Sequence, residues 1–224
     1  MANAVPSYGK DHRFESDRFY QKINISMLTI IEDSSPFYVN FTHSGVAEII
    51  TLCQKELTKI PKVETFLHYK LPIEVSKKIL NLIPFSEKIK FQEDRVSLFI
   101  SAPGYRHYVH IDGASVSLNY GISIVNNECV TNWYSNTDID SNFKVTPNMP
   151  WNRAVIDISE FDKNKQVPIK SFTQKQQEVV LLNTLMYHDF DNSSSKDVRV
   201  ILTLRPTNKQ MQWDEIKNTI QGLE

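Results

Sequence analysis

Residues 115–124 read SVSLNYGISI, and this stretch is the clearest indication of the fold class. Its apolar residues alternate strictly with serine, asparagine and glycine: Val116, Leu118, Tyr120, Ile122 and Ile124. Successive side chains of a β-strand point to opposite faces of a sheet, so strict alternation predicts a strand with one face in a hydrophobic core. We therefore expect a sheet protein built around this strand.

Segments on both sides of this stretch extend the β pattern. Further strands are expected at residues 23–41 (one or two strands), 95–100, 129–134, 153–158, 178–184 and 198–205. Residues 135–150 are rich in Asn, Asp, Ser and Pro and lack periodicity, which predicts a long loop. Many short strands separated by turn residues are typical of an antiparallel sandwich or jelly roll.

Helical periodicity is confined to the ends of the chain. Apolar residues recur at helical spacing over residues 45–57, again between Pro72 and Pro84, and in the segment 211–222. Helices followed by many strands predict an α+β, mainly β domain with the N-terminal helices packed on one sheet. We divide the single domain 1–224 into a loose arm (1–20), a helical and strand support region (21–94), a jelly-roll core (95–206) and a C-terminal helix (207–224).

Composition narrows the possible compartments and partners. The 224 residues include 25 basic and 26 acidic side chains, for a net charge of -1, which disfavours nucleic acid as a partner. Cys53 and Cys129 are the only cysteines, too few for a disulfide framework, and indicate a reducing compartment. No secretion signal and no apolar run of roughly 20 residues is evident. We expect a cytoplasmic protein without a membrane span.

A candidate metal site precedes the central strand. His110 and Asp112 are two residues apart, so on an extended segment both side chains point to the same face. His188 follows much later, after an apolar run that we interpret as a strand leading up to it. Two histidines and one carboxylate that leave open positions on the metal suit non-haem Fe(II). By itself the His-x-Asp spacing is a common chance pattern.

A late strand adds a buried basic residue. In the segment 198–205, Arg199, Thr203 and Arg205 share one face with Ile201. An arginine within an apolar strand is costly to bury unless it is paired, and a ligand carboxylate held by both arms of the guanidinium is a suitable partner. Thr203 could add a hydroxyl donor to the same ligand.

With these residues the chain resembles the iron(II)- and 2-oxoglutarate-dependent oxygenases, in the prolyl-hydroxylase-like or aspartyl/asparaginyl-hydroxylase-like branch. Members have His-x-Asp, a distal His, and a basic residue about ten positions later. His110, Asp112, His188 and Arg199 match that order over residues 95–206. The resemblance implies a double-stranded β-helix (a cupin-like jelly roll), a hydroxylase activity, and Fe(II), 2-oxoglutarate and O2 as cofactor and co-substrates.

The resemblance also implies roles for individual residues. His110, Asp112 and His188 would be the metal ligands, while Arg199 with Thr203 would bind the far carboxylate of 2-oxoglutarate. Asn119 or Tyr120 would touch the co-substrate, although their opposite strand parity allows only one of them to face the site. Arg205 is a rival for the role of Arg199, and His107 is a rival ligand. Asn183, Asp189 or Asn192 would orient the imidazoles through hydrogen bonds.

Two other functions stay open at this point. The chain could be a non-catalytic jelly-roll module that binds metal or serves a structural role. It could also be a metal-dependent hydrolase, for which Asp189 is the only nearby candidate for an acid or base. For an oxygenase, the acceptor could be a peptide, a protein or a small molecule, and the oligomeric state is open.

Overall fold

The fold is taken from a computed structural model that describes residues 28–124, 129–142, 152–156, 161, 166–209 and 211–223. Twelve strands in this part of the chain form two antiparallel sheets. The larger sheet has seven strands, in the spatial order β1 (Leu28–Ser34), β2 (Tyr38–His43), β10 (Val179–Asn183), β6 (Val116–Ser123), β12 (Arg199–Leu204), β4 (Ser97–Ser101) and β3 (Phe66–Lys70). The predicted strand at 115–124 is therefore confirmed as β6, at the centre of this sheet.

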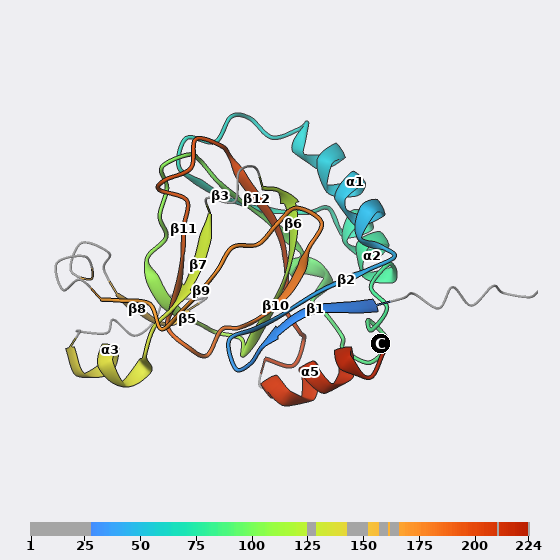
Figure 1. Cartoon of the computed structure of the whole chain (residues 1–224). Helices are drawn as coiled ribbons and strands as arrows, with labels where there is room; N and C mark the ends of the chain where they lie inside the picture. The colour runs from blue at the N-terminus through green and yellow to red at the C-terminus, as the bar shows by residue number, and fades with distance from the viewer. Residues whose placement is uncertain are drawn as a thin grey trace, which may run out of the picture.

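The smaller sheet has five strands and faces the larger one (Figure 1). Its order is β8 (Asn152–Ile156), β5 (Val109–Asp112), β11 (His188–Asp191), β7 (Val130–Trp133) and β9 (Lys170–Phe172). Every pairing in both sheets is antiparallel. The predicted class, mainly β with short antiparallel strands, is confirmed at this level.

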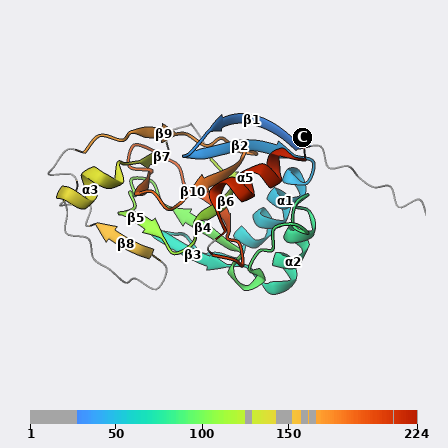
Figure 2. The ribbon, with the colours of Figure 1, turned by 90° about the horizontal axis from the view of Figure 1, so that it is seen from below.

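Helices α1 (Val46–Leu57) and α2 (Ile73–Asn81) cover the outer face of the larger sheet, the face turned away from the smaller sheet (Figures 1 and 2). α5 (Trp213–Gln221) also packs there, and its Trp213, Ile216 and Ile220 join the same core cluster. In α1 the buried residues Val46, Ile49 and Ile50 recur at helical spacing, so a single stripe meets the sheet. The three helices predicted from periodicity are confirmed.

The molecule thus has two interiors. The outer face of the larger sheet contributes alternate residues to the helix-covered core, for example Leu118 and Tyr120 of β6 and Leu202 of β12. The residues between them point to the inner face, toward the smaller sheet. Three rows cross that inner face by register: Lys70, Ser97, Thr203 and Asn119; His68, Phe99, Ile201 and Gly121; and Phe66, Ser101 and Arg199.

Several sequence predictions were wrong in detail. The segment before residue 95 contributes β1 and β2, where one or two strands were expected at 23–41, and a third strand, β3, that was not expected. Residues 136–142 form helix α3 (Asn136–Asn142) where a continuous loop was expected. The strand expected to run up to His188 is two strands, since β10 ends at Asn183 and β11 begins at His188 in the other sheet.

Some predictions lie outside the described residues, among them the loose arm at 1–20 and the rest of the expected loop, residues 143–150. In the part of the chain that the structure covers, no helix has the length and apolar character needed to cross a membrane.

Candidate metal centre

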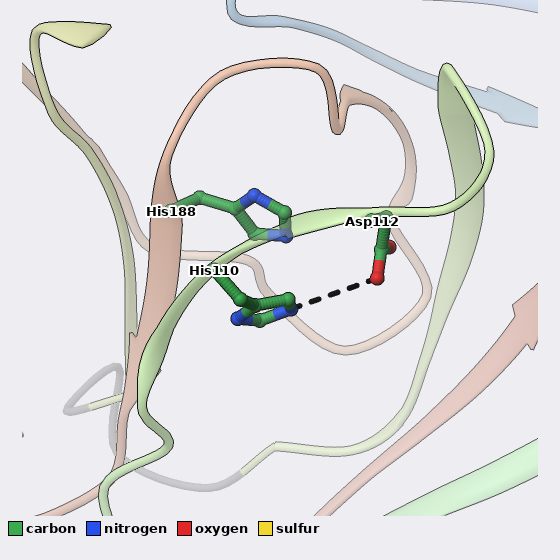
Figure 3. Close-up of side chains that lie close together, drawn as sticks. All are labelled: His110, Asp112 and His188. Carbon is green, nitrogen blue, oxygen red and sulfur yellow. Dashed lines mark ion pairs between the residues drawn. The ribbon is translucent and has the colours of Figure 1, made fainter. Parts of the chain in front are cut away.

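The smaller sheet brings the predicted ligands together. β5 and β11 are antiparallel neighbours, and His110 lies directly opposite His188 in their register. Asp112 lies two residues beyond His110 on the same strand, so its side chain shares the face of that imidazole. One ligand atom from each of the three residues lies within 4.8 Å of the others, and Figure 3 shows the three side chains converging. All three side chains are buried.

The two imidazoles are held in the same way. Nδ1 of His110 lies 2.9 Å from the carbonyl oxygen of Tyr108, and Nδ1 of His188 lies 2.9 Å from that of Met186. A carbonyl oxygen can only accept, so each Nδ1 carries the proton and donates it. Each neutral ring therefore presents an unprotonated Nε2, the form in which imidazole binds a metal. Burial, and then the nearby His188, lower the pKa of His110 to about 4, which keeps that ring neutral.

Asp112 is oriented by an arginine from the larger sheet. The guanidinium of Arg205 donates to Oδ2 of Asp112 at 2.9 Å. Oδ1 of Asp112 lies 3.7 Å from Nε2 of His110, and this contact is dashed in Figure 3. One oxygen of Asp112 is thus held by arginine, while the other lies on the side of the two imidazoles. Partners of this kind fix ligand geometry and tune metal affinity.

Residues of β12 face the triad from the inner face of the larger sheet. Arg199 is only 6% exposed, and its guanidinium carbon lies 5.0 Å from the ring centroid of Phe190. Among the described residues no carboxylate lies within ion-pair distance of Arg199. The hydroxyl of Thr203, on the same face, is buried and has no hydrogen-bond partner in the described part of the chain. The buried Ser101 hydroxyl, opposite Arg199 on β4, has none either.

One cavity joins the triad to these groups. Its lining includes the three triad residues, Arg199, Thr203 and Arg205, together with Asn119, Ser117 and Thr131. Phe99, Leu182, Phe190 and Ile201 add apolar wall, and His107, Thr184 and Asp189 also line the cavity. The cavity therefore has a set of metal-ligand atoms at one wall and, at another, the buried Arg199 and the Thr203 hydroxyl, neither of which has an ion-pair or hydrogen-bond partner among the described residues.

Asn119 and Tyr120 have opposite orientations, as their parity requires. Asn119 lines the cavity. Tyr120 lies in the outer core instead, fully buried, and its hydroxyl is 2.9 Å from Nε2 of His43. The expectation that Tyr120 touches a co-substrate does not fit this placement, because the whole larger sheet separates its hydroxyl from the cavity.

His107 is close to the triad but does not belong to the group of ligand atoms. Its ring stacks on Phe190 at 4.8 Å and 8°, and meets the ring of His110 edge-on at 5.0 Å. Its Nδ1 lies 2.9 Å from the hydroxyl of Tyr105. Burial, with the nearby His110, lowers the pKa of His107 to about 2. His107 is thus a neutral wall of the site.

The side chains proposed to orient the imidazoles form hydrogen bonds to other groups. Main-chain carbonyls orient both imidazoles, whereas Asn183 bonds to Pro36 and Leu185, and Asn192 bonds to Ala102 and Asp197. Main-chain carbonyls therefore take the place of the three candidates Asn183, Asp189 and Asn192 at the Nδ1 atoms of the imidazoles. A side chain at i+2 on a strand can turn its Nδ1 to the carbonyl of residue i, a contact that sequence patterns do not reveal.

Asp189 is fully engaged on the other face of β11. Asn132 donates to its Oδ1 at 2.9 Å, and Arg106 and Tyr134 donate to its Oδ2 at 2.9 and 3.2 Å. Burial raises the pKa of Asp189, the Arg106 guanidinium and the Asn132 amide oppose that rise, and both carboxylate oxygens are held in hydrogen bonds within the fold. The residue that a metal-dependent hydrolase would require is therefore committed to structure.

These residues fit a metal that keeps open coordination positions. The donor set is two neutral imidazole nitrogens and one carboxylate oxygen, all on one side of the space they enclose. Closed structural zinc sites use four protein ligands, whereas two histidines and one carboxylate with open positions match non-haem Fe(II). Arg199 is a second feature of the same cavity, because it has no carboxylate partner among the described residues and could bind an anion there.

Sequence reasoning missed the edge strand β3. Its residues Phe66, His68 and Lys70 face the inner side, while Leu67 and Tyr69 pack toward the helix-covered core. The signal was present, because FLHYK alternates apolar and polar residues after Phe66. Its short length hid it between two helices.

Comparisons with known proteins give the following. The crystal structure of HygX from Streptomyces hygroscopicus with nickel, 2-oxoglutarate and hygromycin B bound aligns with a TM-score of 0.49 and 10% identity, covering 76% of this chain and 83% of that one. The non-heme alpha-ketoglutarate-dependent carbocyclase SnoK from nogalamycin biosynthesis gives 0.49 and 14%, covering 75% and 78%. No protein-family model and no curated protein matches.

Proposed function

We propose that this chain is an Fe(II)- and 2-oxoglutarate-dependent oxygenase with a double-stranded β-helix core, acting as a hydroxylase on a small-molecule or peptide acceptor. The observation that carries the proposal is the pairing of two features in one cavity. His110, Asp112 and His188 offer three metal ligands, and the buried Arg199 has no carboxylate partner among the described residues.

The two features define the chemical groups that a ligand of this cavity must carry. A molecule that reaches from the triad to Arg199 needs one end that chelates metal and another that carries a negative charge. A carboxylate at the Arg199 end would receive the guanidinium fork and the free hydroxyl of Thr203, which satisfies both groups at once. A 2-oxo acid with a second carboxylate has both ends, and 2-oxoglutarate is such a molecule.

The residues of the chain provide binding, orientation and exclusion of water. His110 and His188 present their Nε2 atoms, and Arg205 holds Oδ2 of Asp112 so that Oδ1 lies toward the imidazoles. Asn119 lies on the same inner row as Thr203 and offers a polar contact to the bound co-substrate. Phe99, Leu182 and Ile201 keep this space apolar, which strengthens the charge pairing at Arg199.

Iron, when bound with 2-oxoglutarate and O2, supplies the oxidising chemistry. One oxygen atom of O2 enters the acceptor as a hydroxyl, the other enters succinate, and the 2-oxo acid loses CO2.

The two ends of the cavity can be tested separately. Asp112→Ala removes one of three ligands and should abolish both Fe(II) binding and succinate formation. Arg199→Met leaves the triad intact, so iron binding should persist while 2-oxoglutarate binding weakens by about a hundredfold, as expected when a buried charge-assisted pair is lost. Equilibrium dialysis measures the iron, anaerobic calorimetry the co-substrate, and NMR the succinate.

A matched control is His43→Asn, which removes a buried histidine from the outer core and should leave both kinds of binding unchanged. Wild-type protein that binds neither Fe(II) nor 2-oxoglutarate would rule out the proposal. Metal binding without 2-oxoglutarate binding would instead leave the chain as a metal-binding module.

A further inference from the structure

A second cavity, of about 320 Å³, opens beside the triad along the edge strand β3. It shares His110, Asp112 and Arg205 with the inner cavity, so its inner end is the metal site. Arg199 lines only the inner cavity. We call this second space the mouth cavity. Its volume lies at the small end of the roughly 300–1,000 Å³ of small-molecule sites.

The wall of the mouth cavity is aromatic. Phe99 lies at the centre of this wall, with Phe66 at 5.7 Å and 70° and His68 at 4.9 Å and 83° between ring centroids. On the β5 side, His107 and Tyr108 lie 4.0 Å apart at 32°. Rings held at different angles to one another give a flat ligand ring both face and edge contacts, the arrangements that aromatic pairs prefer.

The rim of the mouth cavity is basic. Lys70 lies on the same face of β3 as His68, and no carboxylate of the described residues comes within ion-pair distance of its amine. His68, Lys70 and Arg205 line the same cavity, and burial, followed by the charges of Arg205 and Lys70, lowers the pKa of His68. The lining also contains Arg95 and two carboxylates, Asp94 and Asp112, the second of which is bonded to Arg205, so its three cations Lys70, Arg95 and Arg205 outnumber the carboxylates by one.

The geometry points to an aromatic carboxylate as the molecule that the mouth cavity binds, with its ring against Phe66 and Phe99 and its carboxylate at Lys70. This inference rests on the proposed function, because it takes the mouth cavity as the place of the acceptor beside the metal. The ring and the charge are required together. An aliphatic anion would leave the aromatic wall uncovered, and a neutral aromatic would leave Lys70 without a counter-charge.

The test compares three probes on the full chain: phenylacetate, phenylacetamide, which has the same shape without the charge, and acetate, which keeps the charge without the ring. Calorimetry is carried out first with metal chelated, then anaerobically with Fe(II) and 2-oxoglutarate. Phenylacetate should bind at least about tenfold more tightly than either other probe in both conditions. Because the first condition needs no iron, failure of the oxygenase proposal and failure of this one give different results.

Variants locate the bound probe. Lys70→Met should reduce phenylacetate affinity to within about twofold of phenylacetamide. Lys62→Met, which removes an exposed lysine outside the cavity lining, should change nothing. Arg199→Met should also retain phenylacetate binding, since Arg199 lies at the inner cavity.

Three results would overturn the inference. They are equal affinity for the acid and the amide, no phenylacetate binding at millimolar concentration, and loss of phenylacetate binding in Arg199→Met but not in Lys70→Met.

Discussion

The two faces of β12 show how one strand serves stability and chemistry with alternate residues. On the outer face, Val200, Leu202 and Leu204 pack into the core beneath the helices. On the inner face, Arg199, Thr203 and Arg205 line the cavity, and the first two have no ion-pair or hydrogen-bond partner in the described part of the chain. Burial alone does not distinguish the faces, because both are removed from water.

The difference lies in how well the buried groups are satisfied. Outer-face side chains are apolar and make their full contribution within the folded chain. Inner-face polar groups are left incomplete, and unsatisfied buried polar groups are costly unless a ligand completes them. Two buried histidines repeat the contrast, since the pKa of both His43 and His110 falls to about 4 on burial. His43 is completed by Tyr120 and Gly45, whereas Nε2 of His110 faces the space between the triad residues.

The largest effect, on the free energy of unfolding, should come from a substitution on the outer face of β12. Leu202→Ala removes a fully buried side chain and should lower the free energy of unfolding by about 3 kcal/mol. Thr203→Val, one residue away on the inner face, should change it by less than about 0.5 kcal/mol, because the lost hydroxyl has no partner among the described residues. Urea denaturation of the two variants measures this. Equal losses would contradict the division between the faces.

A smaller effect on the free energy of unfolding should come from the titration of His43 with pH. The backbone N–H of Gly45 donates to Nδ1 of His43, so the neutral ring carries its proton on Nε2 and faces the hydroxyl of Tyr120. Burial lowers the folded-state pKa of His43 from 6.5 to about 4, so unfolded chains bind the extra proton first. The contribution of neutral His43 to the free energy of unfolding is present above pH 6.5 and is lost as the pH falls toward 4. The loss should be roughly 2 kcal/mol between pH 7.5 and pH 4.5.

His43→Asn is the matched variant, because its amide oxygen can still accept from Gly45 while the side chain no longer titrates. Urea denaturation at several pH values should show a flatter pH dependence for this variant than for the wild type. Parallel curves would show that His43 titrates normally in the folded protein.

The smallest effect should be a change in Fe(II) affinity, caused by a substitution at the contact between the two sheets. Arg205→Lys keeps the charge but loses the fixed geometry of the guanidinium that aims Asp112. Fe(II) affinity should fall by about tenfold, as for other partners of metal ligands. Arg199→Lys is the control and should leave Fe(II) affinity unchanged, since Arg199 has no bond to the triad. Equal iron affinity in wild type and Arg205→Lys would show that Asp112 does not depend on this arginine.

Alternation and helical periodicity were sufficient for the regular elements. The pattern over 115–124 predicted β6, and the apolar stripe over 45–57 predicted α1. In a long segment, the period of the apolar residues indicates both the type of element and its buried face. Short strands such as β3 and β9 offered too few residues for a period to show. Asn136–Asn142 lacked an apolar stripe, so its helix was not visible in the pattern.

The sequence by itself determined which residues share a face: His110 with Asp112, and Arg199 with Thr203 and Arg205. That follows from the two-residue period of a strand and needs no partner. Only the tertiary structure decided what meets across the sheets. The register of β5 against β11 places His188 opposite His110, and the packing of the sheets brings Arg205 to Asp112. It also turns Tyr120 away from the cavity, because which face of a sheet is inner depends on what packs against it.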